Sequence, residues 1–111
     1  MWSNPVQWAH YANNHKGLCF EIELSNRCNA QKVDYVPERL ERSVISSPKF
    51  SEKLLLTKFE NWQYEEEYRI VRPLDNFVKE DGLYFQSLNE DIKITKVIVG
   101  CQSIITKNQV I

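Results

Sequence analysis

Residues 18–24 read Leu-Cys-Phe-Glu-Ile-Glu-Leu, and this stretch decides the fold class. Its even-numbered residues are apolar and its odd-numbered ones are a cysteine and two glutamates, an alternation typical of a β-strand with one apolar face. A second apolar-rich stretch, residues 92–99, lies near the other end of the chain. We therefore expect both stretches to be strands of a sheet.

Working outward, three further stretches are predicted as strands: residues 32–36, 64–72 and 83–88. The first is followed by Pro37 and the second by Pro73, and proline interrupts a strand because it has no N–H to donate. For the start of the stretch 64–72 there is an alternative, in which the helix before it continues to Glu67.

Two principal helices are expected, over residues 4–15 and 48–62. Proline suits the first helical position, and Pro5 and Pro48 occupy that position in the two segments. In the second segment Leu55, Phe59 and Trp62 recur at helical spacing. Gly17 can take the left-handed conformation that ends the first helix.

These elements give an α+β fold of about five mainly antiparallel strands, because the helices do not alternate regularly with the strands. The chain has 111 residues and a mass of 13.2 kDa, which is the size of a single domain spanning 1–111. Its 14 basic and 15 acidic side chains give a net charge of -1, which argues against non-specific nucleic-acid binding. No apolar run reaches the roughly 18 residues of a membrane span, so we expect no membrane partner.

The cysteines point to a reducing compartment. There are three, Cys19, Cys28 and Cys101, so at least one thiol is unpaired, and no Cys-x-x-Cys spacing suggests zinc or redox chemistry. Together with the absence of a signal segment at the start, this favours the cytoplasm.

Glu65, Glu67 and Arg69 are the most informative polar group. On an extended strand they project from one face, each about 6–7 Å from the next. Two close carboxylates raise each other's pKa and an arginine lowers both, so the group can orient a substrate hydroxyl, hold an ion, or act as acid and base. The alternative is a solvent-facing strand surface with a weak Glu–Arg pair.

Other residues extend this candidate site. Lys58 can lie at a pocket mouth, where it would hold an anion together with Arg69. His10 can serve as a general base because imidazole titrates near neutral pH, or it can simply hydrogen-bond a carbonyl at the helix end. If the strand carrying Glu21 and Glu23 neighbours the one carrying Glu65 and Glu67, four carboxylates converge and require a cation such as Mg²⁺.

Three stretches together resemble a known family: WAHYANNHKGLC at residues 8–19, KVDY at 32–35, and KFENWQYEEEYR at 58–69. In this order and spacing they are similar to the bacterial family called domain of unknown function 2971. Members of that family usually carry a further N-terminal portion, so the resemblance implies that this chain is the C-terminal part of a longer family domain. It implies a fold but no established reaction, and no cofactor is assigned.

A looser analogy concerns chemistry. The Glu-x-Glu pattern also occurs in arginine-modifying ADP-ribosyltransferases, in which a His, a Tyr and a Glu on separate elements hold nicotinamide dinucleotide. By this analogy His10, Tyr35 and Glu67 would form such a set, with Glu67 and His10 catalytic. Tyr35, Lys58, Glu65 and Arg69 would then bind the substrate.

Two hypotheses for function follow. The chain is part of a nucleotide- or nucleic-acid-modifying enzyme site, with a nucleotide or dinucleotide as ligand. Alternatively, it is a non-catalytic interaction module that pairs with a missing domain or a second copy of itself as a homodimer, because both ends look cut and would leave apolar surface uncovered.

Overall fold

The structure, a computed structural model, describes residues 2–41 and 49–110. It divides into two compact units: unit 1 is Met1–Cys28 with Phe85–Ile111, and unit 2 is Asn29–Tyr84. A single domain over the whole chain stays a prediction. The expected start of the second helix at Pro48 lies outside the described residues.

Unit 1 begins with helix α1, Pro5–Tyr11, whose start follows the sequence signals. Asn4 caps it, since its Oδ1 accepts a 2.9 Å hydrogen bond from the N–H of Val6. The helix is shorter than the expected 4–15. It ends because Asn13, Asn14 and His15 all have positive φ, at 46°, 51° and 66°. They adopt the left-handed conformation that we had expected of Gly17.

Gly17 is instead required for close packing. A β-carbon on it would lie 3.0 Å from the Cα of Ala12. Gly100 is more tightly placed, because its β-carbon would lie 2.1 Å from the carbonyl oxygen of His15. The N–H of Gly100 also donates to the carbonyl of Gly17 over 2.9 Å. These two glycines therefore bring the turn after α1 against the end of the last strand.

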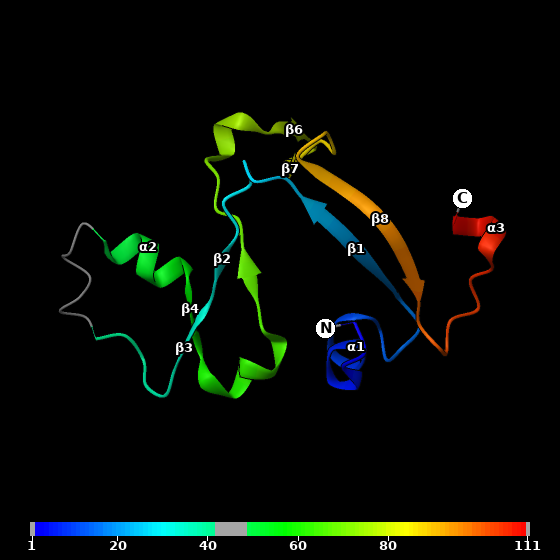
Figure 1. The fold of residues 1–111 in the computed structure, drawn as a ribbon, viewed down its shortest axis with the longest axis horizontal. Coiled ribbons are helices and arrows are strands. Elements are labelled where there is room, and N and C mark those ends of the chain that lie inside the picture. Colours follow the sequence, from blue (N-terminus) through cyan, green and yellow to red (C-terminus); the bar gives the residue numbers. More distant parts are fainter. Residues whose placement is uncertain (1, 42–48, 111) are drawn as a thin grey trace. The chain divides into compact units, whose positions relative to one another are not determined.

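Strands β1, Leu18–Leu24, and β8, Ile92–Val99, form the antiparallel ribbon of unit 1 (Figure 1). Both predicted strands are confirmed at their predicted bounds. The register pairs Leu18 with Val99 and Leu24 with Ile92, and it shifts by one residue between Glu21 and Ile22.

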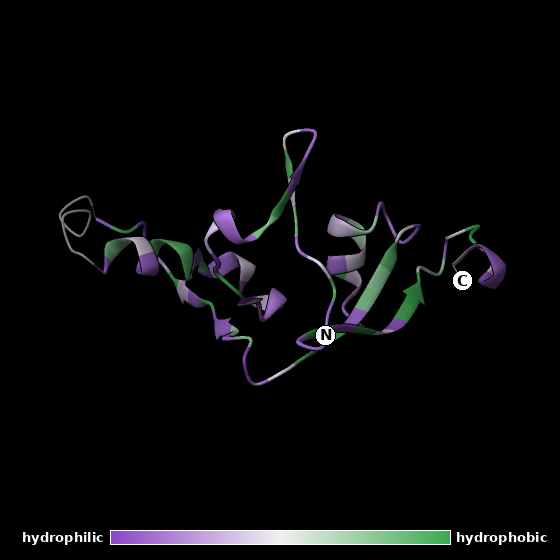
Figure 2. Ribbon diagram, turned by 90° about the horizontal axis from the view of Figure 1, so that it is seen from above, coloured by the Kyte–Doolittle hydropathy of each residue, from purple (hydrophilic) through white to green (hydrophobic). Residues whose placement is uncertain are grey.

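The register shift keeps the ribbon amphipathic. Cross-strand partners share a face, so one face carries eight apolar residues: Leu18, Phe20, Ile22, Leu24, Ile92, Ile94, Val97 and Val99. In β8 these positions change from even to odd numbers at Thr95, the extra residue of the bulge. The opposite face pairs Glu21 with Lys96 and Glu23 with Lys93. The hydropathy colouring of Figure 2 shows apolar residues along both strands.

Unit 2 is built from short strands. Strand β2, Gln31–Lys32, pairs antiparallel with β5, Tyr68–Arg69, whereas β3, Asp34–Val36, pairs in parallel with β4, Thr57–Phe59. Val33 joins β2 to β3 and is 2% exposed, and its N–H donates to the carbonyl of Glu67 over 2.9 Å. The predicted strand 32–36 is thus present but divided in two.

The expected helix over 48–62 is wrong beyond its first part. Helix α2 covers only Phe50–Leu55, then the chain extends as β4 and winds into the 3-10 helix η2, Glu60–Glu65. The apolar spacing of Leu55, Phe59 and Trp62 is helical, but pairing of Thr57–Phe59 with β3 replaces the helix.

The expected strand over 64–72 is also largely wrong. Glu65 is the last residue of η2, and Glu66 follows with a φ of 47°, in the left-handed region. Only Tyr68–Arg69 is extended enough to pair, as β5.

The remaining elements are short. They are η3, Leu74–Asn76; β6, Val78–Glu80; β7, Leu83–Phe85, which ends before the predicted residue 88; and α3, Lys107–Val110. Strands β6 and β7 pair around Asp81 and Gly82, whose φ angles of 48° and 80° are both positive. The α+β class is confirmed. The part of the chain that the structure describes has eight strands, more and shorter than the five expected.

The described residues bury little apolar surface. Only three hydrophobic side chains among them are classed as buried: Ala12, Cys28 and Val33. All three cysteines are free thiols. Within the described ranges, no helix is long and apolar enough to cross a membrane.

Candidate functional site

Five of the six residues predicted for the site meet in unit 2. The Nζ of Lys58 lies between two carboxylates: it binds Oε2 of Glu65 and lies 2.9 Å from Oε2 of Glu67. We call Tyr35, Lys58, Glu65, Glu67 and Arg69 the ion cluster. The side chain of Glu65 is 7% exposed, while those of Lys58, Glu67 and Arg69 are between 22% and 30% exposed.

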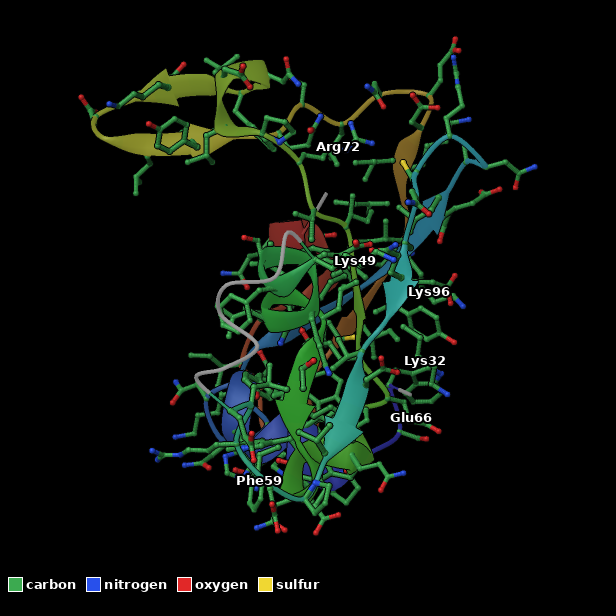
Figure 3. All side chains as sticks on the ribbon, turned by 90° about the vertical axis from the view of Figure 1, so that its left-hand side faces the viewer. Lys32, Lys49, Phe59, Glu66, Arg72 and Lys96 are labelled. Atoms are coloured by element: carbon green, nitrogen blue, oxygen red, sulfur yellow. The ribbon has the colours of Figure 1, made fainter. Side chains whose placement is uncertain are left out.

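The parallel strand pair positions two members of the cluster. Its register places Tyr35 of β3 beside Lys58 of β4, so the side chains of both point to the same face. Val36 and Phe59, one residue further along each strand, point to the other face. Phe59 is labelled in Figure 3, as is Glu66, which follows η2. The Tyr35 hydroxyl accepts a 2.9 Å hydrogen bond from the N–H of Glu67.

Arg69 joins the cluster to the end of α2. Its Nε donates to Oε1 of Glu67 over 2.6 Å and its Nη2 to Oε2 over 3.2 Å, which is the two-pronged geometry that arginine favours with a carboxylate. Its Nη1 donates to the carbonyl oxygen of Leu55 over 2.5 Å. The guanidinium is therefore held on both sides.

These contacts determine the charge states. The hydrogen bond from Arg69, supported by Lys58 and opposed by partial burial, lowers the pKa of Glu67 to about 2. Burial lowers the pKa of Lys58, but its hydrogen bonds to Glu65 and Glu67 outweigh this and raise that pKa above its usual value. Glu67 is consequently ionised at neutral pH, so it accepts hydrogen bonds and does not act as a proton donor.

The route to this arrangement differs from the one predicted. The sequence predicts an extended backbone that points Glu65, Glu67 and Arg69 to the same face. In the structure Glu65 ends a 3-10 helix and Glu66 turns the chain. The side chains nevertheless meet because Lys58 bridges the two carboxylates.

His10 is the sixth predicted residue. It lies on α1 in unit 1, exposed, with its ring 6.3 Å from that of Tyr11. The ion cluster belongs to unit 2, so the grouping of His10 with Tyr35 and Glu67 stays a prediction.

The four-carboxylate arrangement is not formed by neighbouring strands, because β1 pairs with β8 and β5 pairs with β2. Glu21 instead binds Lys96 over 3.0 Å and accepts from Thr95 over 3.0 Å, and both hydrogen bonds lower its pKa. Among the described residues, no group of three or more His, Cys, Asp or Glu side chains could hold a metal ion.

A hollow of about 720 Å³ lies in the same unit. Its apolar lining comes mainly from Val36, Phe59 and two residues of α2, Phe50 and Leu54. Lys58 contributes to this lining, but Glu65, Glu67 and Arg69 do not. Val36 and Phe59 point away from Tyr35, so these parts of the lining lie on the other face of the β3–β4 pair, and Lys58 belongs to both the hollow and the ion cluster.

Sequence reasoning missed three contributors. The carbonyl of Leu55 anchors Arg69, and the left-handed Glu66 turns the chain; neither has a signal in the sequence. Trp62 lies under Lys58, with Nζ 5.3 Å from the ring centroid. The four-residue spacing of Lys58 and Trp62 hinted at this contact, although the helix assumed for it is absent.

Comparison with known families identifies the chain. Residues 7–70, more than half of the 111, match the family described as "Protein of unknown function (DUF2971)". The chain belongs to the DUF2971 family. All three sequence motifs and the six predicted site residues lie inside the part that matches DUF2971. No curated protein and no solved structure matches the chain.

Proposed function

We propose that the ion cluster binds a nucleotide or dinucleotide, as part of a nucleotide- or nucleic-acid-modifying enzyme site. The observation that carries the proposal is Glu67, whose ionised carboxylate is fixed between Arg69 and Lys58 and whose backbone N–H donates to the Tyr35 hydroxyl. Such a preorganised acceptor orients a ligand without rearrangement when the ligand arrives.

In this proposal each residue has a role. Glu67 is the essential carboxylate, Arg69 and Lys58 hold it in place, and Tyr35 contacts the ligand. His10 is the base or a positioning group, loosely as in ADP-ribosyltransferases. We propose a bacterial cytoplasm as the location, and the three free thiols support a reducing compartment.

The test is a thermal-shift screen with nucleotides and dinucleotides, because a ligand that prefers the native state raises the melting temperature. Glu67→Gln should abolish the shift. Glu66→Gln is the matched control, because Glu66 is the next residue to Glu67 but its side chain is exposed and lies outside the ion cluster. If no nucleotide shifts the wild-type protein, or if both variants respond alike, the proposal is wrong.

A second candidate function, the interaction module, is favoured by the apolar face of the β1–β8 ribbon. Phe20, Ile22 and Ile94 on it are 49%, 51% and 42% exposed. A two-stranded ribbon is marginally stable alone and gains stability when a partner covers such a face.

Sedimentation equilibrium tests this candidate. Ile22→Lys should abolish self-association, whereas Ile104→Lys, at an apolar residue that is 96% exposed and off the ribbon, should not. A wild-type monomer at all concentrations would exclude the homodimer.

A further inference from the structure

Resting on the proposed function, we infer that the ion cluster recognises the sugar hydroxyls of a nucleoside, and not the phosphates. The first argument is charge. Lys58 and Arg69 carry two positive charges, and Glu65 and Glu67 carry two negative charges within hydrogen-bond distance of them. The cluster is neutral as a whole, so it has little long-range attraction for a polyanion.

The second argument is the position of those charges. A phosphate that approached the Nζ of Lys58 would also approach Oε2 of Glu67, 2.9 Å away, and the nearby carboxylate of Glu65. Because two carboxylates match the two cations, Lys58 and Arg69, the phosphate would gain no net attraction there. A neutral hydroxyl is not repelled by the carboxylates, which favours a ligand group without charge.

The third argument is the supply of hydrogen bonds. A carboxylate offers about four acceptor positions, two on each oxygen. Oε2 of Glu67 accepts from Lys58 and Arg69, whereas among the described residues Oε1 accepts from Arg69 alone. One acceptor position on Oε1 therefore remains open to a ligand.

Tyr35 supplies the complementary group. Its hydroxyl oxygen accepts from the N–H of Glu67, and within the described residues its own proton has no acceptor. Glu67 thus offers an acceptor through its carboxylate, and Tyr35 offers a donor through the hydroxyl that is bonded to the backbone of the same residue. A sugar hydroxyl both donates and accepts, so a vicinal diol matches this pair, while a phosphate oxygen satisfies only the donor.

The experiment is isothermal titration calorimetry of the full chain with adenosine, uridine, their 2′,3′-dideoxy counterparts and inorganic pyrophosphate. We expect at least one ribonucleoside to bind and its dideoxy counterpart to bind at least about tenfold more weakly, because removing the hydroxyls leaves polar groups of the site unpaired. Pyrophosphate should not bind. Raising NaCl tenfold should change the nucleoside affinity less than about threefold, since no net charge is being screened.

The ligand comparison uses wild-type protein, so it does not depend on a variant that folds. As a second readout, Tyr35→Phe should weaken ribonucleoside binding about tenfold, and Tyr84→Phe, at an exposed residue of β7, should not change it. If pyrophosphate and nucleotides bind in a salt-sensitive way and dideoxynucleosides match ribonucleosides, the inference is overturned while the proposed function stands. If neither nucleosides nor nucleotides bind, both are wrong.

Discussion

The hydroxyl of Tyr35 accepts a 2.9 Å hydrogen bond from the backbone N–H of Glu67, a residue 32 positions later in the chain. Arg69 and Lys58 hold the side chain of the same glutamate. Glu67 is therefore fixed twice, through its backbone by β3 and through its carboxylate by β4 and β5.

The first prediction concerns pH. The folded-state pKa of Glu67, about 2, lies below its usual 4.5. Its contribution to stability is therefore fully present above about pH 4.5 and is lost as the pH falls toward 2. Urea unfolding should show wild type more stable than Glu67→Gln by about 1–3 kcal/mol at pH 7, and this gap should close in acid. A gap at pH 2 as large as the gap at pH 7 would contradict the charge state.

The second prediction concerns Lys58. Removing its ammonium with Lys58→Met leaves Glu65, whose side chain is 7% exposed, without that cation. Breaking such a pair costs about 3–5 kcal/mol. The matched control is Lys53→Met on the exposed surface of α2, expected to change the free energy of unfolding by less than about 0.5 kcal/mol. Equal effects of the two variants in urea unfolding would argue against a structural role for Lys58.

The third prediction compares two glycines. Gly100→Ala should destabilise the protein by up to about 3 kcal/mol, because its β-carbon would lie 2.1 Å from the backbone oxygen of His15. Gly82→Ala has open space around it and only the strain of a φ of 80°, costing about 1 kcal/mol. Urea unfolding measures the free energy lost in each variant. A larger loss for Gly82→Ala than for Gly100→Ala would show that the turn after α1 packs differently.

The fourth prediction concerns thiol reactivity. Cys101 is exposed, whereas Cys28 is buried and its thiol donates to the carbonyl of Asp91 over 3.3 Å. A thiol reagent should label Cys101 at once and Cys28 only as the protein unfolds, because access limits the rate. Mass spectrometry of the labelled peptides identifies the order. Simultaneous labelling in native buffer would mean that the packing around Cys28 is not maintained.

The sequence predicts the fold best where a pattern is long. The alternation over residues 18–24 and the apolar run over 92–99 span seven and eight residues, and both strands form at those bounds. The prediction failed where tertiary pairing overrode a local pattern. Thr57–Phe59 pairs with β3 although the surrounding apolar spacing is helical.

The candidate site shows the same limit. The sequence was sufficient to group the five side chains of the ion cluster, from the charged residues at 65, 67 and 69 and from the motifs that contain Tyr35 and Lys58. The geometry was not predictable, because it depends on the left-handed φ of Glu66, and glutamate is not a residue that marks such a turn. The parallel register of Tyr35 with Lys58 likewise joins segments that have no local connection.

The bulge at Thr95 has a consequence for how this ribbon tolerates change in length. The apolar residues of β8 have even numbers before Thr95 and odd numbers after it, so the bulge keeps both halves of the strand facing the same side. Deleting Thr95 would restore an uninterrupted ladder in which Ile92, Ile94, Val97 and Val99 occupy alternate positions and all stay on the apolar face. The ribbon should therefore tolerate deletion of Thr95 far better than deletion of Lys93, which would turn Ile92 toward the glutamate side.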